Sequence, residues 1–97
     1  MLTHIVLFKL TDPSPEIITT TRDLLLSMDG KIPQLRHLEV GVDIIRSERS
    51  YDIALLTRFE SLDDLNAYQV DPYHAGTIIP HMRSVSCGVV AADYESP

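Results

Sequence analysis

Two strand-length segments of this chain carry apolar side chains on both of their faces. Residues 3–10 read THIVLFKL and residues 51–59 read YDIALLTRF, and both are rich in the β-branched and aromatic residues typical of strands. Because successive side chains of a strand point to opposite sides of a sheet, leaving either face in water would expose a large apolar patch. We therefore expect helices to cover one face of the sheet and a second layer to cover the other.

Capping residues place a helix directly after the first of these strands. Ser14 can accept a hydrogen bond as the N-cap, Pro15 suits the first helical position, and Gly30 suits the position after the helix end. Apolar residues recur at helical spacing between these limits. The pattern predicts a helix over Pro15–Asp29.

Two more segments have the composition and length of strands. Leu38–Ile45 alternates apolar with other residues, and Gly41 inside it suggests a bulge or a close backbone approach. Ser86–Tyr94 reads SCGVVAADY and predicts a buried fourth strand. With the two-faced segments, these make four strands.

A second helix is predicted between the third and fourth strands, and it contains a break. Ser61 is a suitable N-cap, and Leu62 and Leu65 begin a buried helical face. Asp71 and Pro72 then stop this helix and start another, because Asp is a good N-cap and Pro suits the first position of a helix.

The resulting order is strand, helix, strand, strand, helix, strand, which is the split βαβ arrangement of a ferredoxin-like α+β fold. We expect residues 1–97 to form one domain, with an antiparallel four-stranded sheet and two main helices on one face. The helix-free face then needs a cover, and the same sheet from a second copy would supply it. The predicted partner is the protein itself, in a homodimer of facing sheets that buries roughly 800 Å² per protomer.

Composition argues against several classes of function. The formal net charge of −6 leaves no basic stripe for nucleic acid and no attraction to anionic membrane surfaces. The start, MLTHIVLFKL, has neither the basic region nor the cleavage site of a signal peptide, and a single cysteine suits a reducing cytoplasm. We find no nucleotide-binding glycine motif and no H-E-x-x-H zinc motif, so we expect no cofactor and no metal.

The predicted elements together resemble a known family, the stress-responsive dimeric α/β-barrel or Dabb domains. The resemblance lies in THIVLFKL, in the VGVD of the second strand, in YDIALLTRFESLDDLNAYQVDPYH and in the final VVAADYE. It covers nearly the whole chain in the family's order, and FESLDDLNAYQVDPYH is its most specific part. The resemblance implies a ferredoxin-like protomer whose dimer closes two sheets into a barrel.

The resemblance also implies candidate catalytic residues. A few plant members of the family are similar to polyketide cyclases, in which a Tyr and a His of this helical region promote an intramolecular aldol closure. Their motif matches Tyr68 and His74 of this chain. Many relatives carry another His immediately before the proline, where this chain has Asp71, and this departure argues against a His-Pro-x-His metal or proton-relay pair.

The residue types and positions of His74 and Tyr68 fit such chemistry. His74 falls in the first turn of the restarted helix, where the dipole disfavours imidazolium and leaves a neutral base. A phenol at Tyr68 could hydrogen-bond a substrate carbonyl or an enolate. The alternatives are an interface histidine that only packs and a core tyrosine that follows Leu62 and Leu65.

The remaining candidate residues can also be explained by structural roles. His4 shares a face with Val6 and Phe8 and is a weaker catalytic candidate, with a hydrogen-bonded core histidine as the alternative. Arg58 could bind an anion or simply pair with a carboxylate. His81 is assigned to structure, His37 to a loop without a role and Cys87 to the core as a small apolar residue.

Three functions follow from these residues. The first is cofactor-independent acid/base chemistry of the cyclase or aldol type on a small apolar carbonyl compound, bound between the sheet and the second helix. The second is a non-catalytic dimer that protects under stress or binds a ligand. The third, by fold analogy alone, is a cofactorless monooxygenase.

Overall fold

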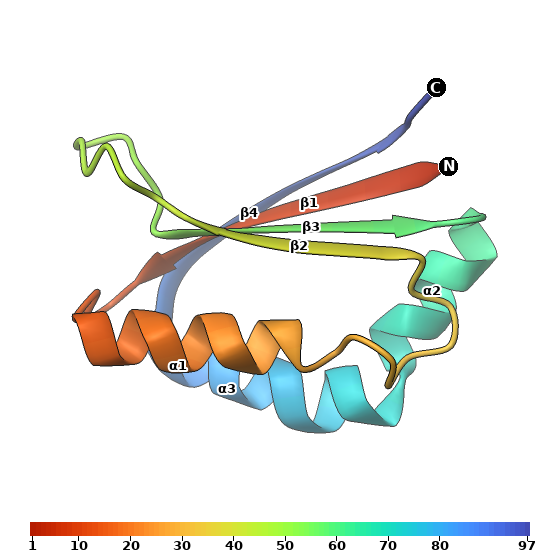
Figure 1. Ribbon diagram of the computed structural model, residues 1–97, viewed down its shortest axis with the longest axis horizontal. Coiled ribbons are helices and arrows are strands. Elements are labelled where there is room, and N and C mark those ends of the chain that lie inside the picture. The colour runs from red at the N-terminus through yellow and green to blue at the C-terminus, as the bar shows by residue number, and fades with distance from the viewer.

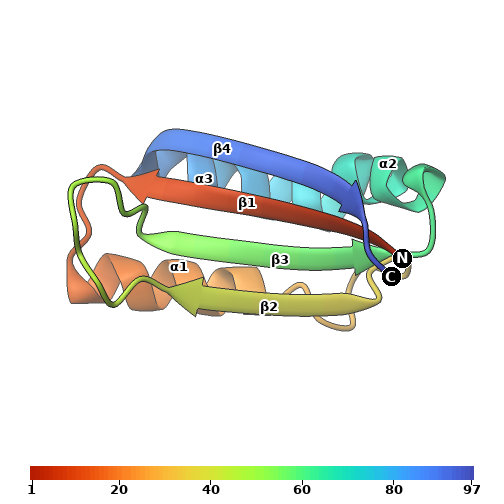
Figure 2. The ribbon, with the colours of Figure 1, turned by 90° about the horizontal axis from the view of Figure 1, so that it is seen from above.

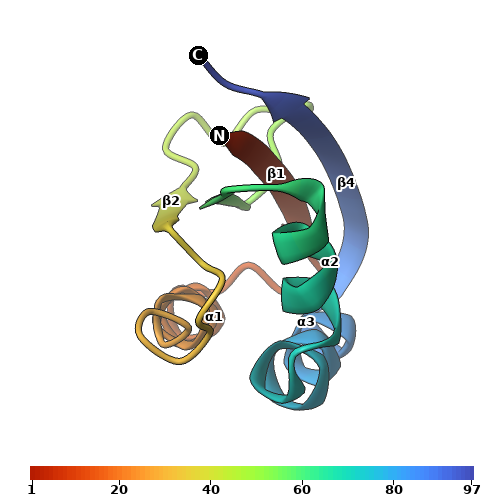
Figure 3. The same cartoon turned by 90° about the vertical axis from the view of Figure 1, so that its right-hand side faces the viewer.

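The computed structural model of the protein describes residues 1–97 and joins four antiparallel strands in one sheet of order β2–β3–β1–β4 (Figures 1 and 2). The helices lie against one face of that sheet, as the side view in Figure 3 shows. This is the predicted ferredoxin-like fold. In chain order the elements are β1 (Leu2–Leu10), α1 (Pro15–Leu26), β2 (His37–Val42), β3 (Ile53–Phe59), α2 (Leu62–Val70), a π-helical turn η1 (His74–Ile78), α3 (Ile79–Val85) and β4 (Ser86–Glu95).

Helix α1 begins where the capping residues predict, but it ends earlier than expected. The Ser14 hydroxyl accepts a hydrogen bond from the Ile17 amide, and Pro15 opens the helix. The helix stops at Leu26 instead of Asp29, because the chain leaves it through tight turns before Gly30. Gly30 has a φ of 78°, a backbone conformation that glycine adopts without strain.

The strands β2 and β3 are shorter than predicted, because the connection between them has its own structure. The Asp43 carboxylate accepts a hydrogen bond from the Arg46 amide, and the Arg46 guanidinium lies 2.9 Å from the buried Asp52 carboxylate. Ile44 and Ile45, predicted to lie in the second strand, are 87% and 73% exposed in this loop. Turn chemistry at an aspartate therefore outweighs the apolar alternation that suggested a longer strand.

Two smaller expectations for β2 are also wrong. His37 is the first residue of the strand and not a loop residue. Gly41 pairs in regular register with Ala54 and has open space where a side chain would lie, so it marks neither a bulge nor a close approach. The only irregularity between paired strands lies elsewhere, at Lys9 and Leu10 of β1 opposite β4.

The predicted helix break is present at Asp71. Its carboxylate accepts a hydrogen bond from the Tyr73 amide and its carbonyl accepts one from Ala75, which is the geometry of an N-cap. The restarted helix passes through a π-turn, in which the Ile79 amide donates to the His74 carbonyl, and then runs on as α3. Pro80, which has no amide hydrogen to donate, is the second residue of α3, just after this widened turn.

The core lies between the helices and the inner face of the sheet. Val6 and Phe8 of β1 and Leu55 and Phe59 of β3 are buried there against residues of α1, α2 and α3.

The fourth strand differs from its prediction, because β4 is an edge strand and most of its residues are exposed. No helix combines the length and apolar character that crossing a membrane would require.

Candidate functional site

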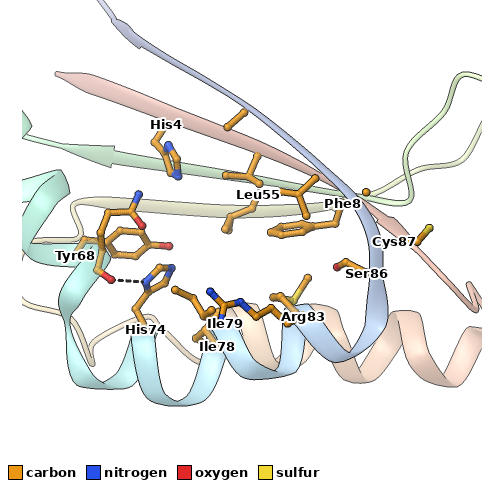
Figure 4. Close-up of a pocket in the computed structure, with 16 residues that line it drawn as sticks. His4, Phe8, Leu55, Tyr68, His74, Ile78, Ile79, Arg83, Ser86 and Cys87 are labelled. Atoms are coloured by element: carbon orange, nitrogen blue, oxygen red, sulfur yellow. Dashed lines mark hydrogen bonds between the residues drawn. The ribbon is translucent and has the colours of Figure 1, made fainter.

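A pocket of about 570 Å³ lies between the inner face of the sheet and the helices that follow β3 (Figure 4). Ten of its sixteen lining residues are hydrophobic, a composition typical of sites for small organic molecules. The sheet contributes residues of β1, β3 and β4, and the opposite wall comes from α2, the π-turn and α3. The polar side chains of the lining belong to His4, Gln69, His74, Arg83 and Ser86, and two of the ten hydrophobic residues, Tyr68 and Cys87, add a phenol and a thiol.

His74 stands in the pocket as a neutral, oriented imidazole. His74 is only 8% exposed, and its Nδ1 lies 3.3 Å from the Gln69 carbonyl (Figure 4). Because a carbonyl oxygen can only accept, Nδ1 carries the hydrogen and Nε2 keeps its lone pair. Burial lowers the pKa of His74 from its ordinary 6.5, and the nearby His4 adds to this, while the Gln69 carbonyl and Asp71 act in the opposite direction.

The low pKa of His74 agrees in direction with the sequence prediction but has another main cause. The prediction relied on the dipole of the restarted helix, whereas burial contributes most. Only the tertiary structure places Tyr68 on one side of the imidazole and the sheet above it (Figure 4). Neutral Nε2 can act as a proton acceptor at neutral pH.

Tyr68 lies directly beside His74 and is fully buried. The two ring centroids are 4.2 Å apart with an interplanar angle of 36°, and Phe59 packs on Tyr68 at 4.9 Å. Burial raises the pKa of the Tyr68 phenol, so it stays protonated at physiological pH. Its hydroxyl donates to the Met28 sulfur over 3.7 Å, a weak acceptor that a ligand oxygen could replace.

His4 enters the same pocket from the sheet. Its ring lies 6.4 Å from that of Tyr68, and its Nδ1 is hydrogen-bonded to the Asp93 carboxylate of β4. The Asp93 carboxylate at Nδ1 fixes the orientation of the ring. The pocket thus contains two histidines and one phenol, contributed by β1, α2 and the π-turn.

The other residues singled out from sequence lie elsewhere or have structural partners. His81 Nε2 lies 3.0 Å from the hydroxyl of buried Thr21, so it joins α3 to α1, as its structural assignment predicts. Arg58 sits on β3 opposite Thr3 of β1, away from the pocket. Cys87 was expected in the core but is exposed at the pocket rim, because the edge strand β4 has no neighbour on its far side. No group of His, Cys, Asp and Glu side chains has the proximity to hold a metal ion.

The comparison with protein families gives the chain its classification. The model of the stress responsive A/B barrel domain, Dabb, matches residues 2–96. The chain belongs to the Dabb family. No match was found among curated proteins.

Solved structures agree with the ferredoxin-like fold. This Dabb protein is similar to a dimeric protein of unknown function with a ferredoxin-like fold from Bacteroides fragilis, at 29% identity and a TM-score of 0.84, over 98% of this chain and 95% of that chain. It is also similar to an Arabidopsis thaliana protein at 21% identity and a TM-score of 0.85, over 100% and 96% of the two chains. A hydroxynitrile lyase from Passiflora edulis shares the fold at 15% identity and a TM-score of 0.76, over 96% and 90%.

Sequence reasoning missed three participants in the site of this Dabb protein. Gln69 orients His74 through its backbone carbonyl, so the residue type at position 69 gives no indication of this role. Asp93 is separated from His4 by 89 residues and meets it only because β1 and β4 pair in the sheet. Arg83 of α3 was not singled out from the sequence, and the structure shows it as an exposed residue that also lines the pocket.

Proposed function

We propose that this Dabb protein is a homodimer in which each protomer binds a small apolar carbonyl compound and moves a proton next to its carbonyl group. The observation that carries the proposal is the neutral His74, whose Nδ1–H is held by Gln69 while its Nε2 is left free in an apolar pocket. A general base needs this combination of a fixed tautomer, a free lone pair and a pKa below the working pH.

The proposed step is an enolisation. His74 Nε2 takes the proton from the carbon α to the carbonyl, the C–H electron pair forms a carbon–carbon double bond, and the carbonyl electrons move to oxygen. The Tyr68 phenol, protonated because it is buried, donates a hydrogen bond to this oxyanion. Attack of the enolate carbon on a second carbonyl of the same molecule closes a ring, and the new alkoxide takes the proton back from His74.

His4 is the third participant in this proposal. Its Nδ1 is hydrogen-bonded to Asp93, which fixes the ring in the pocket, so His4 is placed to contact the second carbonyl while His74 acts as the base. The two histidines therefore have different partners, a carboxylate for His4 and a backbone carbonyl for His74. Only His74 has a pKa lowered by burial, so the proposal assigns the role of base to His74.

The homodimer is supported by the outer face of the sheet. Ile5 pairs with Leu56, and Leu7 lies between Ala54 of β3 and Val90 of β4, so an apolar strip crosses the face without helices. Several relatives of this fold, from Bacteroides fragilis and Thermobifida fusca among others, are described as dimeric. A facing copy would remove this strip from water.

The test is solvent deuterium exchange at the α-carbon of a simple ketone, followed by NMR in D₂O. We expect the wild-type protein to accelerate exchange and His74→Ala to abolish the acceleration while size-exclusion chromatography still shows the same dimer. His81→Ala is a matched control, because His81 lies on the same helical segment but bonds to Thr21 outside the pocket. Equal exchange by the wild-type and His74→Ala proteins would contradict the proposal.

A non-catalytic ligand-binding dimer is the second candidate, and the apolar lining of the pocket favours it. It predicts that an apolar ketone binds with the same affinity to the wild-type and His74→Ala proteins and that neither accelerates exchange. No residue of the pocket favours the monooxygenase alternative, and the antibiotic biosynthesis monooxygenase that shares the fold is 13% identical.

A further inference from the structure

The loop between β2 and β3 carries two isoleucines that do not pack into the core of the protomer. Ile44 is 87% exposed, more than any other large apolar side chain of the protein, and its neighbour Ile45 is 73% exposed. Single exposed apolar residues are common on protein surfaces, but two adjacent ones leave a continuous apolar surface in water. Such a surface marks a contact with another molecule.

Several interactions hold this loop in one conformation. The Arg46 guanidinium lies 2.9 Å from the carboxylate of Asp52, which is only 2% exposed and also accepts a hydrogen bond from the Leu10 amide. The Arg46 amide donates to the Asp43 carboxylate over 2.7 Å. Arg46 has a φ of 58°, an unusual backbone conformation for a residue with a side chain, and these contacts keep it there. The two isoleucines therefore belong to an ordered loop, which loses little conformational freedom when it binds a partner.

This loop lies on the side of the sheet that has no helices. Figure 1 shows it rising from the ends of β2 and β3 on the side opposite α1 and α3, and Figure 3 shows the same arrangement from another direction. A hollow of about 390 Å³ lies between the loop and the sheet, and its walls include Arg49 of the loop and Leu7 and Ala54 of the outer face. Leu7 belongs to the apolar strip of the proposed dimer interface, so the loop and the strip are neighbours on one surface.

We propose that Ile44 and Ile45 pack against the facing copy of this chain, so that the β2–β3 loop of each protomer extends the dimer interface beyond the sheet. The inference rests on the homodimer of the proposed function, and three observations favour a second copy as the occupant. The loop projects toward the side that a facing sheet fills, it adjoins the apolar strip, and relatives with this fold are described as dimeric. Because a two-fold axis makes the contact reciprocal, each protomer contributes two isoleucines and receives two.

The test measures the dimer dissociation constant by analytical ultracentrifugation. We expect the double substitution Ile44→Ser, Ile45→Ser to raise it about a hundredfold, because four isoleucines leave the interface of each dimer. The double substitution Leu62→Ser, Val70→Ser is the matched control. It also removes two aliphatic side chains, 62% and 75% exposed, but both lie on α2, so the dissociation constant should not change. A rise of the same size in both variants would overturn the inference.

A second measurement tests whether the loop is covered in the dimer. Cys87 is the single cysteine of the chain, so Ile44→Cys in a Cys87→Ser background gives one thiol, at the loop. Val70→Cys in the same background gives one thiol at a site of similar exposure on α2. We expect a maleimide to react about tenfold more slowly at position 44 than at position 70 when the protein is dimeric, because a covered thiolate is inaccessible. Equal rates would show that position 44 faces solvent in the dimer and would overturn the inference.

Failure of the homodimer and failure of the loop contact give different results. A wild-type protein that sediments as a monomer rejects the homodimer and the loop contact together. A dimer that is weakened by Leu56→Asp in the apolar strip, but not by the Ile44→Ser, Ile45→Ser substitution, rejects only the loop contact.

Discussion

The two faces of the sheet are both apolar, yet only the inner face has hydrogen-bonded histidines beside a pocket. On the inner face the buried imidazoles of His4 and His74 each have a hydrogen-bond acceptor, and an open pocket remains between them and the apolar wall. On the outer face Ile5, Leu7 and Leu56 form a half-buried apolar strip that contains no histidine. The inner face is thus suited to a small molecule and the outer face to another protein surface.

The largest effect is expected when a charge is placed in the outer strip, which tests whether this strip is the dimer interface. Leu56→Asp would put one carboxylate from each protomer into the apolar interface, at about 3 kcal/mol each, or about 6 kcal/mol for the pair. We expect the dimer dissociation constant to rise on the order of ten-thousandfold, which analytical ultracentrifugation can measure. Leu62→Asp is the matched control, since Leu62, which was wrongly expected on the buried face of α2, is 62% exposed and does not lie on the sheet. Dimers of unchanged affinity would show that the strip is not the interface.

Removal of the proposed base tests the inner face. We expect His74→Ala to slow deuterium exchange of the ketone by at least a hundredfold, the usual contribution of a positioned general base. His37→Ala should leave exchange unchanged, because His37 is an exposed residue of β2 outside the pocket. If both variants lose activity alike, the effect does not come from the pocket.

The stability of the protein should depend on pH through the buried His74. Its folded-state pKa lies below the ordinary 6.5, so between these two values the unfolded chain binds more protons than the folded one. The free energy of unfolding should therefore be full above pH 6.5 and fall as pH decreases below it, by less than about 1.4 kcal/mol per pH unit. The loss is complete once the pH has passed the lower folded-state pKa.

Urea denaturation of the wild-type protein and of His74→Gln at several pH values would measure this dependence. His4 and Asp71 are the titratable groups that influence His74, and both are retained in this variant. We expect the slope below pH 6.5 to be shallower in His74→Gln. Identical slopes in both proteins would assign the pH dependence to other groups.

The smallest effect separates the two histidines of the restarted helix. Thr21→Val removes the hydroxyl that bonds His81 and should lower the free energy of unfolding by about 1 kcal/mol, measured by urea denaturation. Ketone exchange should not change, since neither residue lines the pocket. A loss of exchange at full stability would instead connect α1 to the site.

The sequence by itself determined the order of the elements, the caps of the helices and the presence of apolar residues on both faces of the strands. These features follow from local rules, such as side-chain alternation at Thr3–Leu10 and the helix break at Asp71-Pro72. The resemblance to the Dabb family pointed to Tyr68 and His74, and the structure places their rings side by side. Their catalytic roles stay predictions.

Only the tertiary structure decided which groups meet. His4 has Asp93 as its partner through strand pairing, and Cys87 is exposed because β4 lies at the edge of the sheet. Contacts between residues far apart in the chain leave no periodicity for local rules to detect. The tautomer and low pKa of His74 likewise come from a backbone carbonyl and from burial, which exist only once the chain has folded.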